Sequence, residues 1–322
     1  MYNPEQKQSF LNTITNDNSY KSYQRVFKAV EDMEKRFGKD ISEMSIDEVL
    51  TVLDFKTGTR TTNTEQFMSL LRMYVDWCIQ NGKTTSENNF EKIDATEIDK
   101  TRIYKSKYIK DPEELEQMIS VVFQPGYDFN AGVENPKELC VRLCYEGMED
   151  EEIVLLKKTD VDYENGVIYS PIYEDIIYKV SDRILYLCKF CSEMTEIEYA
   201  NKTGVRAEKL CDNDYVLRRR IGNLRGNPDS EPINKVIVIR RIKEFSDRYM
   251  EEADSYRGIT ASKLRESRMF YQIHCSDDTN NFIENAIVND IKIKNPEITN
   301  RQMYERIRQI KSSFKMWEAA FY

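Results

Sequence analysis

The chain has 322 residues, of which 40% are hydrophobic and 32% are charged, and its mean hydropathy is −0.66. A chain of this length holds about two domains, and its longest apolar runs are far too short to cross a bilayer, which excludes a membrane-spanning protein. The net charge of −9 disfavours a nucleic-acid partner when taken alone, but segregated charge can override the total. The opening residues, MYNPEQKQSF, have no basic stretch followed by an apolar one, so we expect no secretory signal and a cytoplasmic location.

The first hundred residues predict a helical bundle. Segment 16–38 carries apolar residues at three- and four-residue steps and ends at Gly38. Segment 45–55 begins with a capping box, in which Glu48 follows Ser45 by three residues. Segment 61–83 has the clearest apolar stripe and ends at an Asn–Gly pair. The spacing therefore predicts three to four packed helices in a domain that covers residues 1–104.

A second domain is predicted over residues 105–322. Residues 84–110 are polar and end in three lysines, which is typical of a linker between domains. A new helix is predicted at 111–123, with Asp111 as its cap and Pro112 at its first position. Further helices are predicted at about 136–147, 177–192, 195–201 and 232–254, and an Asn–Gly turn predicts a β-hairpin at 161–171. The predicted fold class is mainly α with a small β-sheet.

Residues 145–162, YEGMEDEEIVLLKKTDVD, predict a tight turn at Gly147 between two helices, and the turn is crowded with acids. From 146 to 165 there are eight acidic residues and two lysines. The acids could cap the second helix, because carboxylates favour a helix N-terminus. They could also bind a cation such as magnesium, but consecutive acids point around a helix and do not converge. A third alternative is that one of them replaces a residue of another kind.

Cysteine usage indicates free thiols in a reducing compartment, because the seven cysteines are an odd, scattered set. CKFC at 188–191 is the only CxxC, and a zinc site would need it to combine with Cys140 and Cys144. Apolar packing of these cysteines on helices is the simpler interpretation. We predict no metal and no cofactor.

Positive charge gathers in the C-terminal half. Residues 218–268 hold thirteen lysines and arginines against eight acids, and residues 292–315 hold seven against two. Arg218, Arg219, Arg220 and Arg225 are typical of phosphate contacts, although an exposed basic loop would have the same composition. In the tail, basic residues recur at seven-residue steps and therefore share one helix face, which could reach DNA or pack on a second copy.

The order of these parts resembles the phage integrase, or tyrosine recombinase, family. The resemblance covers about residues 5–275 and includes the helix that starts with EEL and the helix–Gly turn–helix–DVD–hairpin succession. It implies an N-terminal helical core-binding (SAM-like) bundle and a C-terminal catalytic-type domain, which together clamp duplex DNA. It also implies that residues 57–66 present a helix start to the major groove, and that a later basic helix meets the DNA backbone.

The catalytic boxes of that family are degenerate here. The position of the first catalytic arginine falls on Glu149, which repels a phosphate. The H-x-x-R box matches Ser262 to Arg265, so the arginine is kept and the histidine is lost. The L-G-H box has no match, and the single His274 follows Arg265 too closely to serve. Phosphoryl transfer needs several positioned cations and proton donors together, so we predict no catalytic residues and no enzyme activity.

These observations predict a non-catalytic, sequence-specific DNA-binding protein. The resemblance extends to phage repressors with an integrase fold, and implies a transcriptional repressor that binds double-stranded operator DNA of a phage genome and maintains lysogeny in a bacterial host cell. The alternative is an active tyrosine recombinase with a divergent site, using Tyr304 or Tyr322; an unrelated helical protein is a third. A homodimer through the C-terminal tail is a further expectation. The predicted DNA-binding residues are Arg60, Thr61, Thr62, Asn63, Lys105, Lys107, Arg218, Arg219, Arg220, Arg225, Lys263, Arg265 and Arg268.

Overall fold

The computed structural model describes residues 1–322 except 58–60, 97, 124–129, 202–203 and 222–230. The chain forms two compact units, Met1–Ser106 and Lys107–Tyr322, so the division falls two residues after the one we expected from the sequence. Within the described ranges, no helix is both long enough and apolar enough to pass through a membrane.

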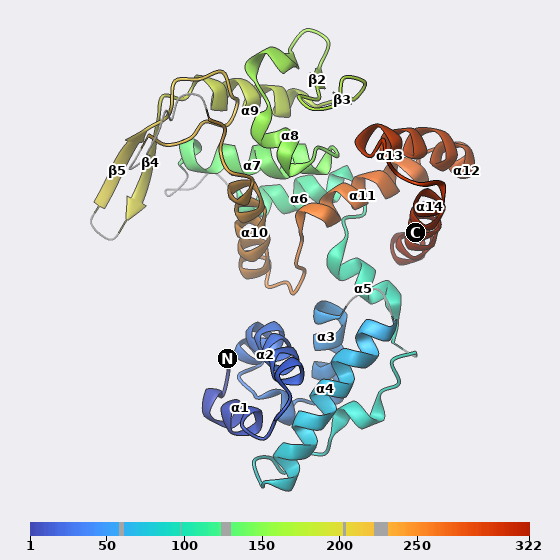
Figure 1. The fold of residues 1–322 in the computed structure, drawn as a ribbon. Coiled ribbons are helices and arrows are strands. Elements are labelled where there is room, and N and C mark those ends of the chain that lie inside the picture. The colour runs from blue at the N-terminus through green and yellow to red at the C-terminus, as the bar shows by residue number, and fades with distance from the viewer. Residues whose placement is uncertain (58–60, 97, 124–129, 202–203, 222–230) are drawn as a thin grey trace. The chain divides into compact units, whose positions relative to one another are not determined.

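The first unit is built from helices (Figure 1). In chain order these are α1 (Pro4–Leu11), α2 (Asp17–Phe37), the 3-10 turn η1 (Ile41–Glu43), α3 (Ile46–Lys56), α4 (Thr61–Gln80), the 3-10 turn η2 (Asn89–Lys92) and α5 (Lys100–Lys107), which runs to the boundary. The predicted caps are confirmed: Gly38 ends α2 in the left-handed region, and Ser45 and Glu48 form the capping box of α3. Polar caps and glycine stops therefore fix where these helices begin and end.

An aromatic cluster forms the centre of the first unit. Phe10 packs edge-on against Tyr23 and Tyr74, with ring centroids 4.9 and 5.3 Å apart, and Phe27 meets Tyr74 at 4.8 Å. These rings come from α1, α2 and α4 and are almost fully buried. Edge-to-face pairs add to the free energy of burial, so this one cluster holds α1, α2 and α4 together.

The interpretation of residues 84–110 as a linker is wrong. Much of this segment is folded into the first unit: Phe90 of η2 and both Ile103 and Tyr104 of α5 are buried. Arg72 of α4 donates hydrogen bonds to the carbonyl oxygens of Phe90 and Ile93, at 2.9 and 2.8 Å. The polar composition was misleading because a few widely spaced apolar residues are sufficient to dock a segment against a bundle.

The second unit is mostly helical and carries two small sheets. Its helices are α6 (Pro112–Val122), α7 (Ala131–Tyr145), α8 (Asp150–Leu155), η3 (Lys158–Asp160), α9 (Asp182–Glu193), α10 (Lys235–Glu252), α11 (Ala261–His274), α12 (Thr279–Phe282), the π-helical turn η5 (Ile283–Ile287), α13 (Val288–Lys294) and α14 (Asn300–Phe321). The described strands are β1 (Val161–Asp162), β2 (Val167–Tyr169), β3 (Ile177–Lys179), β4 (Glu196–Asn201) and β5 (Gly204–Lys209).

Both sheets are antiparallel. β1, β2 and β3 form a meander in which Val161 pairs with Ile168 and Ile168 pairs with Tyr178. β4 and β5 form a separate ribbon from Glu196↔Lys209 to Asn201↔Gly204. The predicted hairpin at 161–171 is confirmed, and Gly166 adopts a φ of 68° in its turn, a conformation that glycine reaches without strain.

Two predicted helices contain strands instead. Residues 177–179 form β3 and only 182–193 are helical, and the segment predicted as a helix at 195–201 lies in β4. In β4 polar and apolar residues alternate from Glu196 to Tyr199, which is the strand period, whereas β3 has only three residues and no pattern of its own. The helix predicted at 136–147 begins earlier, at Ala131, and tolerates Pro136 within its second turn.

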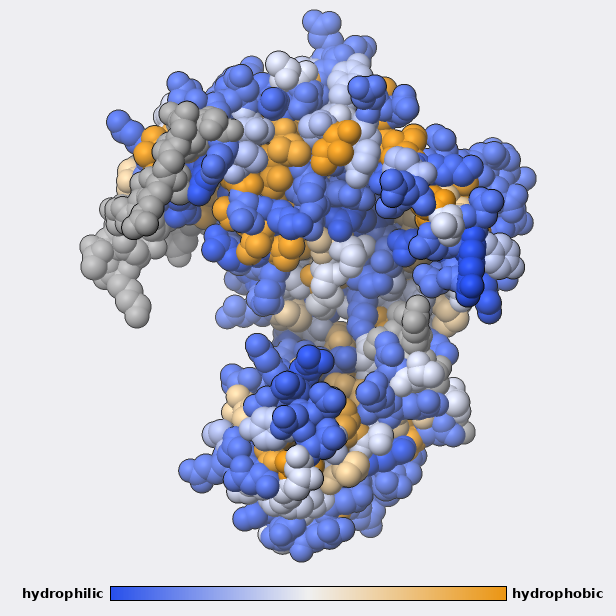
Figure 2. Space-filling view, in the orientation of Figure 1, coloured by the Kyte–Doolittle hydropathy of each residue, from blue (hydrophilic) through white to orange (hydrophobic). Residues whose placement is uncertain are grey.

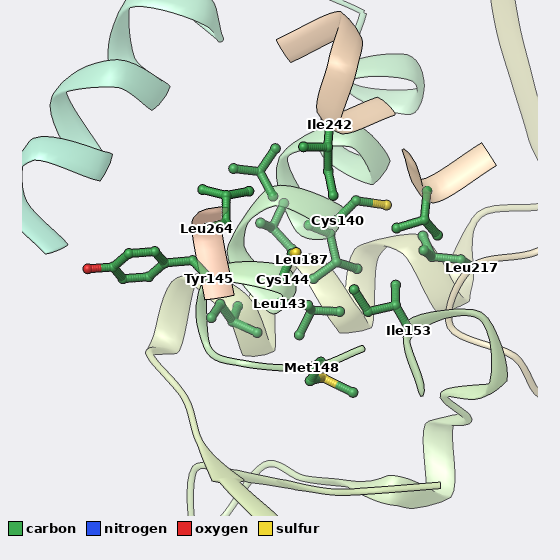
Figure 3. Close-up of a cluster of buried hydrophobic side chains, with 14 of the residues drawn as sticks. Cys140, Leu143, Cys144, Tyr145, Met148, Ile153, Leu187, Leu217, Ile242 and Leu264 are labelled. Carbon is green, nitrogen blue, oxygen red and sulfur yellow. The ribbon is translucent and has the colours of Figure 1, made fainter. Parts of the chain in front are cut away.

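The core of the second unit surrounds α7. In the close-up of Figure 3, Cys140, Leu143 and Cys144 of α7 lie among residues from the neighbouring elements. Those neighbours are Leu187 of α9, Ile242 of α10 and Leu264 of α11. All six of these side chains are buried, so α7 is the element on which the flanking helices are positioned.

Candidate nucleic-acid interface

The acidic turn connects α7 to α8 on the rim of this core. Gly147 has a φ of 102°, which side chains rarely permit, and it lets the chain reverse directly after α7. Glu149 then caps α8, and the carboxylate of Glu152 accepts a hydrogen bond from the Glu149 backbone N–H at 2.8 Å. The sequence prediction of a turn followed by a capped helix is therefore confirmed.

Two of the acids in this turn are paired with arginines of α11. Asp150 Oδ1 lies 2.9 Å from Arg265 Nη1, and Glu146 Oε2 lies 3.0 Å from Arg268 Nη2. These four side chains are between 16% and 26% exposed, so the pairs are partly shielded from water. The crowding of like charges is thus offset by two guanidinium groups from a helix more than a hundred residues further along the chain.

Of the remaining acids, Glu151 pairs with Lys235, and Glu149 and Glu152 accept hydrogen bonds from hydroxyl groups. Glu152 is fully buried and accepts hydrogen bonds from the hydroxyls of Tyr178 and Ser170, at 2.8 and 2.6 Å. Burial raises the pKa of the Tyr178 hydroxyl, with a further contribution from Glu152, so this hydroxyl stays protonated and donates. Glu149 has a longer contact, 3.4 Å, from the Tyr173 hydroxyl, and it forms no ion pair within the described part of the chain.

Burial also affects the protonation of Glu146. Removal of this carboxyl from water raises its pKa, while the Arg268 guanidinium opposes that shift. The effect of burial is the larger one, so the pKa of Glu146 is raised and its carboxylate is protonated more readily than that of an exposed glutamate.

A cavity of about 1250 Å³ opens beside the turn. Glu149, Ser262 and Arg265, the three positions that the sequence resemblance matches to catalytic boxes, all line it. Its other walls come from β3, α13 and the N-terminal half of α14, including Tyr178, Lys294 and Gln302. The structure therefore brings together residues that are separated by more than a hundred positions in the sequence.

The predicted basic residues of α11 are all engaged with acids. Arg265 and Arg268 pair with the acidic turn, and Lys263 Nζ lies 2.7 Å from Glu266 Oε2 and also contacts the Tyr108 hydroxyl. The sequence identified the helix face correctly as one surface, but it did not indicate that carboxylates cover the arginines.

The three arginines at 218–220 also form contacts within the protein. Arg218 donates hydrogen bonds to the carbonyl oxygens of Ser192, at 2.7 Å, and of Met194, and so supports the end of α9. Arg219 pairs with Glu231, and Arg220 lies 3.5 Å from Glu208. Arg225 lies outside the described residues.

In the first unit, the predicted contact residues lie at the start of α4. Thr62 and Asn63 are exposed in its first turn, Thr61 begins the helix, and Arg60 lies outside the described residues. At the end of the unit, Lys105 of α5 is exposed. Lys107, the last residue of α5, is half-buried.

One exposed surface was missed by sequence reasoning. On α10, Val236 and Ile239 are 62% and 46% exposed and stand beside the exposed cations Lys235, Arg240 and Lys243. Figure 2 shows hydrophobic residues among hydrophilic ones over α10. The sequence did contain a signal for this surface. In a helix, four consecutive apolar residues such as VIVI at 236–239 cannot all face one core, so some of them must be exposed.

Comparison with known proteins identifies the architecture. Residues 1–80 match the family model "MrpR, N-terminal core-binding domain", and residues 133–315 match "MrpR, C-terminal catalytic domain". The SPbeta prophage-derived uncharacterized protein YopR of Bacillus subtilis (strain 168) is 23% identical over 261 residues, which cover 76% of this chain and 75% of YopR.

Similar solved structures include a recombinase and a transposon integrase. XerA recombinase is 14% identical, with 95% of this chain and 98% of XerA covered at a TM-score of 0.38. A Tn1549 transposon integrase in complex with circular intermediate DNA is 11% identical. The match covers 86% of this chain and 88% of the integrase chain, at a TM-score of 0.35.

The family models and the match to YopR confirm the resemblance predicted from the sequence, and together with the observed helices and small sheets they confirm the predicted fold class. The two matches fall on different units, and the second alone spans more than half of the chain. The chain belongs to the MrpR family, with the family's N-terminal core-binding domain in the first unit and its C-terminal catalytic domain in the second.

Proposed function

We propose that this protein binds duplex DNA in a sequence-specific manner without cleaving it, and that it acts as a phage transcriptional repressor that maintains lysogeny. Membership of the MrpR family supports the DNA-binding part of the proposal, and the likeness to a prophage-derived protein supports the phage setting. In the bacterial host cell the operator DNA would lie in the cytoplasm.

The observation that carries the non-catalytic part is the composition of the cavity. A carboxylate, Glu149, stands at the position of the first catalytic arginine, and the arginine that remains, Arg265, is neutralised by Asp150. Cleavage requires cations that can accept the charge developing on the reacting phosphate. A cavity with an added carboxylate and a paired arginine offers little of that stabilisation.

Neither candidate nucleophile has the surroundings that cleavage needs. Burial, with help from Asp111, raises the pKa of Tyr322 to about 12, and its ring stacks on His274 with centroids 3.9 Å apart. Tyr304 is 69% exposed and does not contribute to the lining of the cavity, although its neighbour Glu305 does. A raised pKa disfavours the deprotonated, nucleophilic form of a tyrosine.

For the DNA contacts we favour exposed residues of both units. Thr62 and Asn63 at the start of α4 are suited to reach phosphates and base edges. On α10, Val236 and Ile239 offer apolar contact of the kind that thymine methyl groups accept. Lys235, Arg240 and Lys243 form ion pairs that are exposed to solvent and therefore weak, so these cations can still offer charge to the backbone.

The same proposal includes a homodimer formed by exchange of the C-terminal tail. In the single chain, Trp317 of α14 is fully buried and donates a hydrogen bond to the carbonyl oxygen of Ile109 at 3.1 Å. Exchange of α14 would re-form this contact between two copies. Light scattering of the protein with and without DNA tests it, and a monomer under both conditions would remove this part of the proposal.

Footprinting of the purified protein on the DNA of its own phage tests the repressor function. We expect protection of a few discrete elements, and uniform or absent protection would contradict sequence-specific binding. A suicide DNA substrate tests the enzyme alternative. We expect no covalent adduct from the wild type or from Glu149→Arg, because the histidines of the family boxes are still missing; an adduct through Tyr304 or Tyr322 would overturn the non-catalytic assignment.

A further inference from the structure

We propose that Glu146 and Asp150 act as internal competitors of DNA phosphate, which keep Arg268 and Arg265 from holding the DNA backbone. This inference rests on the proposed DNA-binding function and concerns the same cavity. It assigns the acidic turn a role in specificity: the two carboxylates lower the affinity of the protein for DNA of arbitrary sequence.

The geometry of the pairs supports this role. Each arginine directs a terminal nitrogen to one carboxylate oxygen, at 2.9 Å for Asp150 and 3.0 Å for Glu146. An arginine fork is able to bind phosphate through two parallel hydrogen bonds, and it can do so only if its nitrogens are free. Each carboxylate therefore occupies one of the two donor nitrogens that a two-point contact with a backbone phosphate would use.

The two arginines can be reached from solvent even though each is paired with a carboxylate. Arg265 and Arg268 both line the open cavity and are 26% and 22% exposed, so a competing anion could reach them. The Nε of Arg268 is buried and has no hydrogen-bond partner among the described residues. The fork of Arg268 thus retains unused donor capacity, as expected for an arginine held by a single oxygen of a substitute anion.

The carboxylates themselves cannot move away easily. Glu146 directly follows the last turn of α7, and Asp150 lies in the first turn of α8, which is fixed by the capping contact between Glu152 and the Glu149 backbone. A phosphate that displaced either acid would leave a partly buried carboxylate without its cation, next to a second negative charge. That arrangement is costly, so the two ion pairs resist displacement by a phosphate.

The consequence is a better ratio of specific to non-specific binding. Non-specific affinity comes mainly from phosphate neutralisation, whereas discrimination comes from base contacts and DNA shape. Neutralising two arginines in the interface removes affinity that every sequence would share, and it leaves any discrimination provided by other surfaces intact.

The test is a DNA titration of the full-length protein on a short duplex of arbitrary sequence at several salt concentrations. Asp150→Asn and Glu146→Gln keep the shape of each side chain and remove its charge. We expect each variant to bind more tightly than the wild type, and the slope of log K against log salt to steepen by up to about 0.9 for each arginine released. The double variant is expected to steepen it by up to about 1.8.

Glu164→Gln is the matched control. Glu164 is an exposed acid in the turn between β1 and β2, and no ion pair involving it is found in the described ranges, so this change alters the net charge equally without releasing an arginine. Thermal melts show whether each variant is folded. Because the two pairs are separate, Glu146→Gln still tests the inference if Asp150→Asn does not fold.

A double-mutant cycle makes the test specific. Arg265→Gln alone leaves the charge of Asp150 unpaired and should weaken binding, and in the Asp150→Asn background it should abolish the gain, because no released arginine remains. If the wild type binds DNA while the acid-to-amide variants match it in affinity and slope, or gain no more than Glu164→Gln, the competitor role is wrong and the proposed function stands. If neither the wild type nor the variants bind DNA at low salt, both fail together.

Discussion

Each unit of the protein contains a cluster of ion pairs, and the two clusters differ in one respect. In the first unit, Lys7 contacts Glu34 and lies 3.8 Å from Asp40, and all three residues are almost completely buried. In the second unit, the pairs of Arg265 and Arg268 line an open cavity. The chemistry of the groups is the same, but only the second cluster can meet a ligand.

The sealed cluster is satisfied entirely by the protein. Glu34 also accepts a hydrogen bond from the Ile41 backbone at 3.0 Å, and Asp40 accepts from the Tyr74 hydroxyl and from the Ser42 backbone, each at 3.1 Å. A buried polar network of this kind is costly when incomplete, and it connects α1, α2, η1 and α4 in one arrangement. Such a network contributes to the specificity of the fold, whereas the pairs around the cavity remain open to competition.

The largest effect is expected when the sealed cluster is broken. Lys7→Met leaves Glu34 and Asp40 buried without their cation, and we expect a loss of about 3–5 kcal/mol in the free energy of unfolding of the first unit. Chemical denaturation measures the loss. The double variant Lys7→Met, Glu34→Gln is the control, because it removes the charges of the closest pair, leaves only Asp40 without its cation and should recover part of the stability; a loss below about 1 kcal/mol in the single variant would contradict the comparison.

The sealed cluster should also make stability depend on pH. Burial raises the pKa of Glu34 to about 7, against the opposing effect of Lys7, whereas the value in the unfolded chain is near 4.5. The folded state therefore holds this proton more tightly, and its contribution to stability is complete below about 4.5 and is lost as pH rises to about 7.

Unfolding measured across this pH window, for the wild type and for Glu34→Gln, isolates that contribution. We expect the wild type to lose about 1–3 kcal/mol relative to the variant between the two limits. Exposed carboxylates with lowered pKa values act in the opposite direction, but they are common to both proteins and cancel. Parallel curves for the two proteins would show that Glu34 does not titrate in this range.

A smaller effect is expected for the cluster at the cavity. Arg268→Gln removes the partner of Glu146, and because the pair is partly exposed we expect a loss of about 1 kcal/mol in the free energy of unfolding at low salt. The loss should shrink as salt is added, since water and ions reach the pair. A loss as large as that of Lys7→Met, and independent of salt, would show that the two clusters do not differ as described.

The smallest effect is expected for a surface pair of the same residue types. Lys235 and Glu151 lie 2.7 Å apart, but their side chains are 57% and 49% exposed. Lys235→Gln should leave the midpoint of thermal unfolding unchanged within error, because solvent screens such pairs almost fully. A clear drop in this midpoint would mean that solvent exposure does not determine the order in which these three sets of ion pairs contribute to stability.

Much of the fold was predictable because it depends on local signals. Caps, glycine stops and apolar stripes located α2, α3, α4 and α6 to within a few residues, and the Asn–Gly pair located the first hairpin. The errors occurred where an element is short. β3 and β4 have too few residues for their period to be distinguished from that of an adjoining helix, and tertiary pairing decides such cases.

The candidate site also has some features that the sequence predicts and others that only the tertiary structure reveals. The sequence by itself determined that a carboxylate stands at position 149, that Arg265 lacks a histidine three residues before it, and that the chain has the order of parts of an integrase-like protein. Only the tertiary structure decided that Asp150 and Glu146 meet Arg265 and Arg268. The reason is physical: residue identity fixes the charge of a side chain, but whether that charge is neutralised depends on which distant groups the packing of α11 against α7 brings within about 3 Å.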